Sequence, residues 1–380
     1  MTRWDAETAV VGLGSWGASA LWRLAARGVD VIGLERFTPG HALGSSYGGA
    51  RMVRLTGAEH PGLLPLARRS RQLWAELARA GQDGLFTPCG GLLIGPENGP
   101  LAGGALRTAR AHGVPVRTFT ATALRFRFPR HTGVPAHHIG VWEPSAGLVR
   151  PRRAVRAAVA LAERAGARVR TDSRVVRVER VPGGVRLHTA TGSVTARQAV
   201  LTAGAWLPGL VPGLPVQSVR APFSRFRPLD AADSGFDLEG FPVFRRELDD
   251  GRILWGSGAQ GGDDVGLGLE DAGAAKPVDP EDTDRSVTAD DWSDLARLLP
   301  AKVPGLETLP ARTAVGTRTR TPDGLFVCGR PGGDPRLVVA GGGGADSAAY
   351  APGVGDALAD LVQGAAGAAG LDFLSPDRFG

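Results

Sequence analysis

At the start of the chain, apolar runs are separated by glycines in an order that predicts a strand, a helix and a second strand. Thr8–Leu13 is an apolar run typical of a buried parallel strand. A helix is expected from Ser15 to about Arg27, and Gly28 ends it. Val29–Glu35 is a second apolar run that ends in an acid. The N-terminal segment therefore predicts one complete β-α-β unit.

The rest of the chain alternates between two kinds of pattern. Pro61–Ala80 and Arg150–Arg164 carry apolar residues at the spacing of amphipathic helices, and short strands follow the second of them. From about Val216 to Leu309, short strands separated by turns predict mainly antiparallel pairing. Apolar strands and a final helix over about Val354–Val362 then return to the first pattern.

This order of elements predicts an α/β fold with two domains. One is a Rossmann-like nucleotide-binding domain, and the other is an inserted α+β, mainly antiparallel substrate domain. We expect residues 1–80, 141–215 and 311–380 to form the discontinuous nucleotide-binding domain. Residues 81–140 and 216–310 are expected to form the substrate domain.

The glycines between the first strand and the first helix have the spacing of a dinucleotide-binding turn. Gly12 permits the tight turn, Gly14 lets a pyrophosphate approach the backbone, and Gly17 lets the helix pack closely on the strand. The helix N-terminus offers amides and a positive dipole to the phosphates. Glu35, at the end of the second strand, can bind the hydroxyls of an adenosine ribose. A purely structural glycine-rich turn is the weaker alternative.

Composition and charge exclude several other classes of protein. Of the 380 residues, 43% are hydrophobic and 22% are charged, which is typical of a globular protein with a core. Only Lys276 and Lys302 among the 44 basic residues are lysines, and no basic stripe with aromatics occurs. No nucleic-acid partner is therefore expected, despite the net charge of +6. No metal site is expected either, because the cysteines and histidines form no ligand motif.

The cysteines also bear on the compartment. Cys89 and Cys328 are too few and too far apart for a disulfide framework, which fits a reducing environment. The charged start of the chain lacks the apolar region of a secretory signal, and no apolar run is long enough to span a membrane. We expect a cytoplasmic protein that acts on a small molecule. The sequence does not fix the oligomeric state, and a monomer is compatible with it.

Four motifs carry a resemblance to one family. They are Gly33–Phe37, Gly44–Arg54, Glu143–Gly147 and Thr202–Trp206, and they occur in that family's order and spacing. Over nearly its whole length the chain resembles the monomeric sarcosine oxidase and N-methyltryptophan oxidase family of D-amino-acid-oxidase-like flavoproteins. The resemblance implies an FAD enzyme in which an amine loses a hydride from carbon to the flavin and leaves as an imine. In that family oxygen then reoxidises the flavin.

The glycine pattern and the resemblance together assign a set of FAD-binding residues. They are Gly12, Gly14, Ser15, Trp16, Gly17, Glu35, Arg36, Gly44, Ser45, Arg51, Ala203, Gly204, Trp206, Gly342, Gly343 and Gly344. Arg51 and Arg54 match the family's two arginines, one near the flavin and one gripping the substrate carboxylate. Arginine suits both roles, because it is always charged and binds in two-pronged fashion. The alternative for this pair is a phosphate-facing or surface position.

The chain departs from the family at the residues that carry chemistry. Gly316 stands where the family has the cysteine that attaches FAD covalently, so FAD is expected to be bound non-covalently. Gly266 replaces the lysine beside the flavin that promotes reaction with oxygen. Alanine replaces a second lysine, which holds the substrate carboxylate in the family. Ser46 and Tyr47 replace its paired histidines.

These departures suggest a rebuilt substrate pocket. We expect Tyr47, Trp255 and Tyr350 to form its walls, and Arg54 and Arg318 to bind an anion or a carbonyl group. Asp346 is a candidate partner for the substrate amine. The alternative reading places Tyr350 in the core and turns Arg318 toward solvent.

The leading function is FAD-dependent oxidation of a C–N bond in a secondary amine or amino-acid-like metabolite. Because the oxygen-promoting lysine is absent, a dehydrogenase with another electron acceptor is a variant of this reading. A second reading is a tailoring enzyme that desaturates or oxidises a larger biosynthetic intermediate. A third is a flavin-binding protein without redox turnover.

Overall fold

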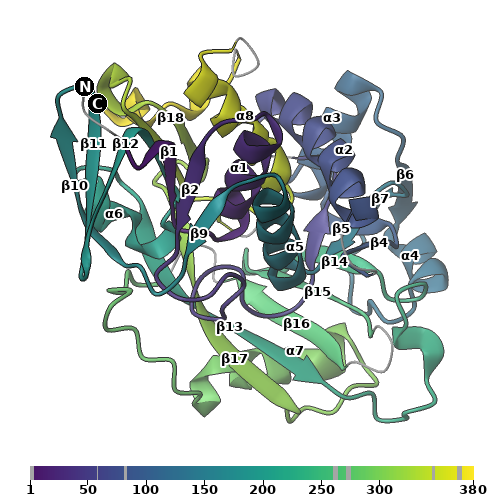
Figure 1. Ribbon diagram of the computed structural model, residues 1–380. Coiled ribbons are helices and arrows are strands. Elements are labelled where there is room, and N and C mark those ends of the chain that lie inside the picture. The colour runs from purple at the N-terminus through teal and green to yellow at the C-terminus, as the bar shows by residue number, and fades with distance from the viewer. Residues whose placement is uncertain are drawn as a thin grey trace.

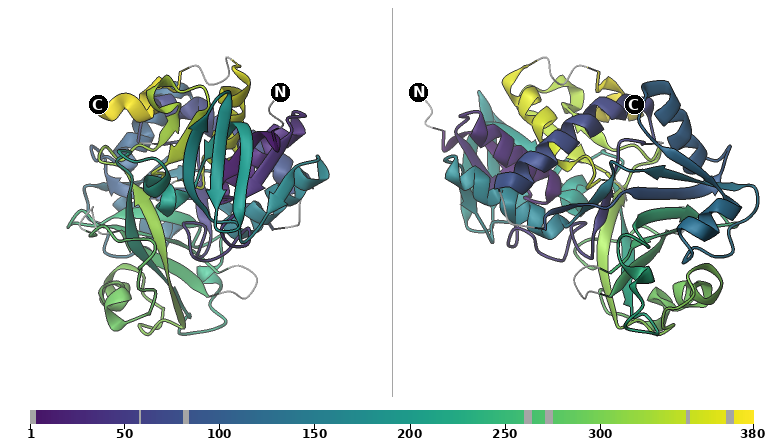
Figure 2. Two further views of the ribbon diagram at one scale, coloured as in Figure 1. Left: turned by 60° about the vertical axis from the view of Figure 1, so that its left-hand side comes forward. Right: turned by 90° about the vertical axis from the view of Figure 1, so that its right-hand side faces the viewer.

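The computed structural model describes residues 4–57, 59–80, 84–259, 264–270, 275–344, 347–365 and 370–380. Two large sheets organise this part of the chain (Figure 1). In both views of Figure 2, the green strands of the second sheet lie below the purple and teal strands of the first. Asp346, the predicted amine partner, lies outside the described residues.

The first sheet carries the predicted β-α-β unit. Its strands are β1 (Ala6–Val11), β2 (Val31–Leu34), β9 (Arg168–Arg170), β10 (Val175–Val181), β11 (Gly184–Thr189), β12 (Gly192–Leu201), β18 (Val327–Gly329) and β19 (Leu337–Gly341). They follow the order β10-β11-β12-β1-β2-β9, and β19 pairs with both β12 and β18. β1 is parallel to β2 and β12, so their carboxyl ends meet at one edge, where such sheets bind ligands.

Four helices form a layer on one face of this sheet. They are α1 (Ser15–Ala26), α2 (Leu64–Ala80), α5 (Pro151–Arg164) and α8 (Ala351–Gln363), and the short α6 (Leu207–Leu210) lies near β10. α1 packs between α5 and α8, and α2 packs on α8. A Cβ on Gly355 of α8 would lie 2.5 Å from the backbone of Ser19 in α1. Glycine therefore permits this close helix contact, and the apolar faces of the helices form the first core.

A nearly buried carboxylate joins three of these helices. Asp356 of α8 is 6% exposed and accepts from Arg23 of α1 at 2.7 Å and from Arg69 of α2 at 2.6 Å. Arg27 of α1 is a third partner. Burial alone would raise the pKa of Asp356, but the hydrogen bonds of the three guanidinium groups outweigh it and hold that pKa below its usual value. The cluster therefore fixes the relative positions of α1, α2 and α8.

The second sheet is mainly antiparallel, as expected. Its strands are β5 (Gly91–Pro96), β6 (Arg117–Thr120), β7 (His138–Glu143), β13 (Gln217–Phe226), β14 (Val243–Glu247), β15 (Ile253–Ser257), β16 (Val265–Glu270) and β17 (Arg312–Arg320), in the order β17-β13-β16-β15-β14-β5-β7-β6. Only the β14–β5 pair is parallel among its described pairs. The helices α3 (Ala102–His112), α4 (Ala121–Arg127) and α7 (Ser293–Lys302) accompany it, and its core consists mainly of leucines and phenylalanines.

Two strands differ from the expected division of the chain. Residues 141–143 are expected in the nucleotide-binding domain, but they belong to β7 and pair with β5 in the second sheet. Residues 311–380 are expected in the nucleotide-binding domain, but β17 pairs with β13 at nine consecutive positions and so belongs to the second sheet. The pairing is possible because both strands are long and uninterrupted. Three short strands form a separate third sheet. They are β3 (Arg51–Val53), β4 (Phe86–Pro88) and β8 (Gly147–Val149), in the order β3-β8-β4. The α/β class itself is confirmed.

Among the described residues, no helix combines the length and the apolar character that crossing a bilayer would require. The same residues contain no group of three or more His, Cys, Asp or Glu side chains arranged to hold a metal ion.

Candidate active site

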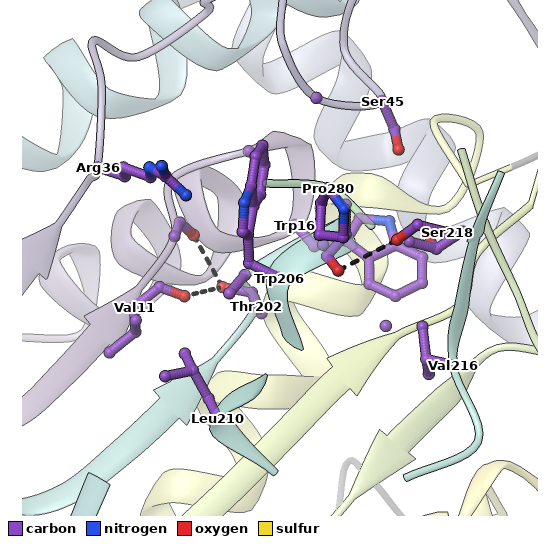
Figure 3. A pocket seen from close by; sticks show the side chains of 18 of the residues that line it. Val11, Trp16, Arg36, Ser45, Thr202, Trp206, Leu210, Val216, Ser218 and Pro280 are labelled. Carbon is purple, nitrogen blue, oxygen red and sulfur yellow. Dashed lines mark hydrogen bonds between the residues drawn. The ribbon is translucent and has the colours of Figure 1, made fainter. Parts of the chain in front are cut away.

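A cavity of about 570 Å³ lies at the carboxyl edge of the first sheet, and we call it the first cavity. The turn after β1, the end of β2, residues 202–206 and the glycines after β19 line it. The hydroxyl of Thr202 donates to the carbonyls of Val11 at 3.1 Å and of Gly12 at 2.9 Å (Figure 3). This pair of hydrogen bonds fixes the glycine turn against the segment that follows β12.

The backbone at Gly12 and Gly17 has the close geometry that the spacing of the glycines predicts. Gly12 has φ of +86°, a left-handed conformation that favours glycine. A Cβ on Gly17 would lie 1.9 Å from the carbonyl oxygen of Gly12, so only glycine lets α1 approach the turn. Nothing lies within 4 Å of a Cβ on Gly14. The backbone at the start of α1 is therefore open to the first cavity, where a phosphate can meet helix amides.

Glu35 lies at the end of β2 and is 3% exposed. Its Oε2 accepts from the backbone N–H of Leu13 at 2.7 Å, and its Oε1 accepts from that of Phe37 at 2.9 Å. These bonds fix the carboxylate at the wall of the first cavity. Each oxygen has a further lone pair, with which it can accept from the hydroxyls of a bound ribose.

A segment from the substrate part of the chain closes the first cavity. Residues 277–281 line it, and Glu281 accepts two hydrogen bonds from Arg36, at 2.6 and 2.8 Å. The guanidinium of Arg36 also lies over the rings of Phe37 and Trp206, 5.0 and 5.3 Å from their centroids. Figure 3 shows Arg36, Trp206 and Pro280 around the same opening. The sequence patterns gave no sign of this closing segment.

Most residues predicted to bind FAD line the first cavity. They are Gly12, Gly14, Ser15, Trp16, Glu35, Arg36, Gly44, Ser45, Ala203, Gly204, Trp206, Gly342 and Gly343. Gly17 supports the turn from behind, and Arg51 and Gly344 line a neighbouring cavity instead.

That neighbouring cavity, the second cavity, has a volume of about 280 Å³. It shares Ser45 and Ser347 with the first cavity, so the two spaces meet. Strands β13–β17 form much of its wall. Among the residues predicted for the substrate pocket, it brings together Tyr47, Arg51, Trp255 and Arg318.

Arg51 lies at the aromatic end of the second cavity. Its guanidinium carbon is 5.7 Å from the ring centroid of Tyr47 and 5.2 Å from that of Trp255. The same group donates to the carbonyl of Tyr47 at 3.0 Å. Burial lowers the pKa of Arg51, although an arginine of this kind remains protonated at neutral pH. The cavity therefore has a fixed positive charge between two aromatic rings.

Aromatic rings cover the backbone at Gly316 and Gly266. A Cβ on Gly316 would lie 2.1 Å from Cδ1 of Tyr47, so no side chain fits there beside that ring. A Cβ on Gly266 would lie 2.6 Å from Cζ of Phe223, whose ring stacks on Trp255 at 5.4 Å. Aromatic rings thus occupy the space that longer side chains at 266 and 316 would need.

The structure places Arg54 and Tyr350 away from the second cavity. The side chain of Arg54 is 3% exposed and binds Glu59 at 2.6 Å. The hydroxyl of Tyr350 lies 3.4 Å from the other oxygen of Glu59, and its ring packs in the first core near Phe326. Tyr350 therefore has the core position that was its alternative reading. Neither residue is among the described residues that line the second cavity.

The motif Glu143–Gly147 has a positioning role. Glu143 is 2% exposed and accepts from the backbone N–H groups of Leu55 and Thr56, at 2.9 and 3.0 Å. It also accepts from the hydroxyls of Thr56 and Ser145 at 2.8 and 2.9 Å. The carboxylate therefore anchors the chain directly after β3, which contains Arg51.

Within the described part of the chain, seven charged residues that the motifs did not reveal also line the second cavity: Arg220, Arg245, Arg252, Glu270, Asp290, Asp291 and Asp294. Two of them, Glu270 and Arg245, contact each other. Glu270 accepts from Arg245 at 2.9 Å, and its other oxygen lies 3.8 Å from Nη1 of Arg318. One signal could have found Glu270: it lies two and four positions after Gly268 and Gly266 on β16, and so on the same face of the strand. Arg245 carries no comparable signal.

Comparisons with known proteins agree with this geometry. A model of the family described as FAD dependent oxidoreductase matches residues 7–361. The chain is 33% identical over 360 residues to the monomeric sarcosine oxidase of Streptomyces avermitilis, covering 94% of this chain and 93% of that protein. It is 30% identical over 372 residues to the N-methyl-L-tryptophan oxidase of Citrobacter koseri, covering 97% and 98%. In fold it is similar to the L-proline dehydrogenase of P. horikoshii, with a TM-score of 0.83, 19% identity, and coverage of 100% of this chain and 98% of that one.

Proposed function

Because this chain belongs to the FAD-dependent oxidoreductase family, we propose that it oxidises a C–N bond of a small secondary amine or amino-acid-like metabolite. One observation carries this proposal: the first and second cavities share Ser45 and Ser347. A cofactor in the first cavity would therefore reach the wall of the second, where a substrate can lie against it. The sarcosine and N-methyl-L-tryptophan oxidases among its relatives support this substrate class.

The residues of the first cavity fit FAD. The open backbone at Gly14 and the start of α1 would receive the pyrophosphate, and Glu35 would bind the adenosine ribose. Arg36, clamped by Glu281 and stacked on Trp206, would cover the nucleotide end. When bound, FAD supplies the two-electron oxidant that accepts a hydride from carbon.

We further propose that the flavin is held without a covalent bond. Gly316 has no side chain with which to form one, and the ring of Tyr47 fills the adjacent space. Neither cysteine lines either cavity among the described residues, and burial raises the pKa of Cys328 to about 12. A thiol with such a pKa is a poor nucleophile at neutral pH.

The walls of the second cavity would orient the substrate. Trp255 and Tyr47 present aromatic surface that excludes water from the reacting carbon, and Arg51 and Arg318 provide fixed positive charge. Positive charge near the flavin stabilises the negative charge that develops there as electrons arrive. Positioning and electrostatics are the main contributions that a flavin site needs from its protein.

One observation favours an electron acceptor other than oxygen as a second candidate. Gly266 offers no cation at the position where the family resemblance implies a lysine, and the ring of Phe223 covers it. A dehydrogenase that uses a different acceptor is therefore the alternative within the same reaction class. Its test is the rate at which air restores the absorbance of the reduced protein.

We also propose that the protein works in the cytoplasm on a freely diffusing small molecule. The two free cysteines, Cys89 and Cys328, support a reducing compartment.

The function is tested with the purified protein and its bound flavin. Acid precipitation should leave the yellow flavin in the supernatant, since no covalent bond retains it. An anaerobic panel of N-methyl amino acids, cyclic imino acids and aryl amines should contain at least one compound that bleaches the flavin absorbance. The proposal fails if the protein binds flavin and no amine bleaches it.

A further inference from the structure

The charged side chains around the second cavity differ in how many hydrogen-bond and ion-pair partners they have. Among its acids, Asp290 is exposed to water, Asp291 is paired with Arg220, and Asp294 is paired with Arg297 and Arg252. Glu270 is different. Its Oε2 accepts from Arg245, but its Oε1 is buried and has no hydrogen-bond donor within the described residues. A buried polar atom without a partner calls for a physical explanation.

The position of Glu270 explains which ligand could satisfy it. A Cβ on Gly268 would lie 2.5 Å from the ring of Trp255, so this ring lies over β16 at Gly268. Glu270 is two residues further along the strand and therefore stands on the same face as that contact. Its side chain is 15% exposed and lines the second cavity. The carboxylate and the aromatic wall therefore face the same space.

The cation nearest to Oε1 of Glu270 is too far away to donate a hydrogen bond to it. Nη1 of Arg318 lies 3.8 Å away, which is within ion-pair range but longer than a hydrogen bond. The guanidinium of Arg318 makes no hydrogen bond to any described residue and also lines the second cavity. An acceptor and a donor group thus stand side by side, each with unused capacity. Arg245 and Arg51 are the other cations near Glu270.

We propose that Glu270 and Arg318 together bind the ammonium and carboxylate groups of a zwitterionic secondary amino acid. Glu270 then accepts a proton from the ammonium group of this substrate. The inference rests on the proposed function and names the substrate class of the same site. The substrate carboxylate pairs with Arg318, and the ammonium N–H donates to Oε1 of Glu270. In an amino acid these two groups are adjacent, as are Oε1 and Nη1 here.

The proton transfer is balanced by the oxidation that follows it. The N–H proton moves to Oε1, which leaves a lone pair on the nitrogen. That pair forms the C=N bond as the C–H bond on the neighbouring carbon breaks, and the C–H electron pair leaves as hydride to the FAD oxidant. A neutral amine that loses a hydride yields an iminium cation, which water then hydrolyses. Without a group to remove the proton, the nitrogen has no lone pair to donate.

The test compares wild type with Glu270→Gln by anaerobic bleaching of the flavin at several pH values. Glutamine keeps an acceptor for Arg245 but cannot take a proton. We expect bleaching by the best N-methyl amino acid to slow about 100-fold at pH 7. Raising the pH toward the pKa of the free substrate ammonium should restore the rate, because the substrate then arrives neutral. Glu270→Asp, which keeps a carboxylate, should retain the wild-type shape of the pH profile.

Glu247→Gln is the matched control, since Glu247 lies on β14 of the same sheet and is not among the described residues lining the second cavity. Its rate and pH profile should equal those of wild type. The flavin content and Tm of each variant show whether it folds. An unchanged pH profile in Glu270→Gln, with wild type bleached normally, overturns this inference alone. Failure of every amine to bleach wild type overturns the proposed function and this inference with it.

Discussion

The ring of Tyr47 and the missing side chain of Gly316 are complementary: a Cβ at 316 would lie 2.1 Å from Cδ1 of Tyr47. Tyr47 is 4% exposed, and its hydroxyl donates to the carbonyl of Ala221 on β13. The ring is therefore held from both ends and cannot easily turn away. The effects on stability of substitutions at these two contacting residues should therefore be coupled.

Gly316→Ala should destabilise the protein by about 1–3 kcal/mol, because the new methyl group overpacks the space beside Tyr47. Tyr47→Ala removes the ring, so the double variant should lose less stability than the sum of the two single variants. Urea unfolding of all four proteins measures this coupling. Gly209→Ala is the control, since nothing lies within 4 Å of its added Cβ. Strictly additive losses would contradict the proposed contact.

Glu35→Gln should weaken FAD binding about 10- to 100-fold, because hydrogen bonds to a charged acceptor contribute about 1.5–3 kcal/mol. The buried carboxylate also organises the backbone N–H groups of Leu13 and Phe37, which an amide can do only in part. Titration of the flavin-free protein with FAD, followed by fluorescence, gives the Kd. Glu179→Gln, at a half-buried position on β10 of the same sheet that does not line the first cavity among the described residues, should leave the Kd unchanged.

Glu281→Gln should speed the dissociation of FAD several-fold, because it removes the charge that clamps Arg36 over the first cavity. Hydrogen bonds from Arg36 hold the pKa of Glu281 below its usual value, and Arg174 adds to this effect. The clamp is therefore intact above the usual glutamate pKa of about 4.3 and is lost as the pH falls through the lowered value.

Flavin release from wild type, measured by fluorescence, should accordingly accelerate in acid and at high salt. In Glu281→Gln the same release should depend less on both conditions. Equal dependence in the two proteins would show that the clamp does not retain the cofactor.

Asp356→Ala should cost about 1.5–3 kcal/mol, since Arg23, Arg27 and Arg69 lose their shared charged acceptor. Among the described residues, only Arg23 and Arg27 keep another carboxylate, Glu76 and Asp360. The lowered pKa of Asp356 means that its contribution is complete above the unfolded value of about 3.9 and disappears as the pH falls through the folded value. Wild type should therefore lose stability in acid more steeply than the variant.

Asp30→Asn is the control for this cluster. Its partner Arg168 is 48% exposed, so the pair is screened by water and the loss should be within about 1 kcal/mol. Thermal unfolding across pH 3–7 compares the three proteins. A similar small loss in both variants would show that the Asp356 cluster is no stronger than a surface pair.

The sequence predicts features that a short stretch of chain determines, but not features that depend on contacts between distant segments. The turn at Gly12 and the open backbone at Gly14 follow from spacing and backbone chemistry, so they could be predicted from a short stretch. β17 could not, because its place depends on pairing with β13, far away in the chain. The partner of Glu270 lies on another strand, and sequence patterns do not encode which strands become neighbours.

Arg54 shows a different limit. Its position in the motif could be read from the sequence, but its choice of Glu59 as partner depends on side-chain packing near Tyr350. Motifs give the position of a charge along the chain, whereas its direction is decided by packing. Arg54 as the binder of a substrate carboxylate stays a prediction.

The segment 277–281 has a consequence for how far this protein can be taken apart. In sequence it lies between β16 and β17 of the second sheet, but it closes a cavity at the edge of the first. Neither half could therefore be excised as an independent module, since each would lack a wall supplied by the other. In a chimaera that takes the antiparallel half from a relative, the segment over the first cavity would come from that relative. Such a chimaera should lose its cofactor before it loses its fold.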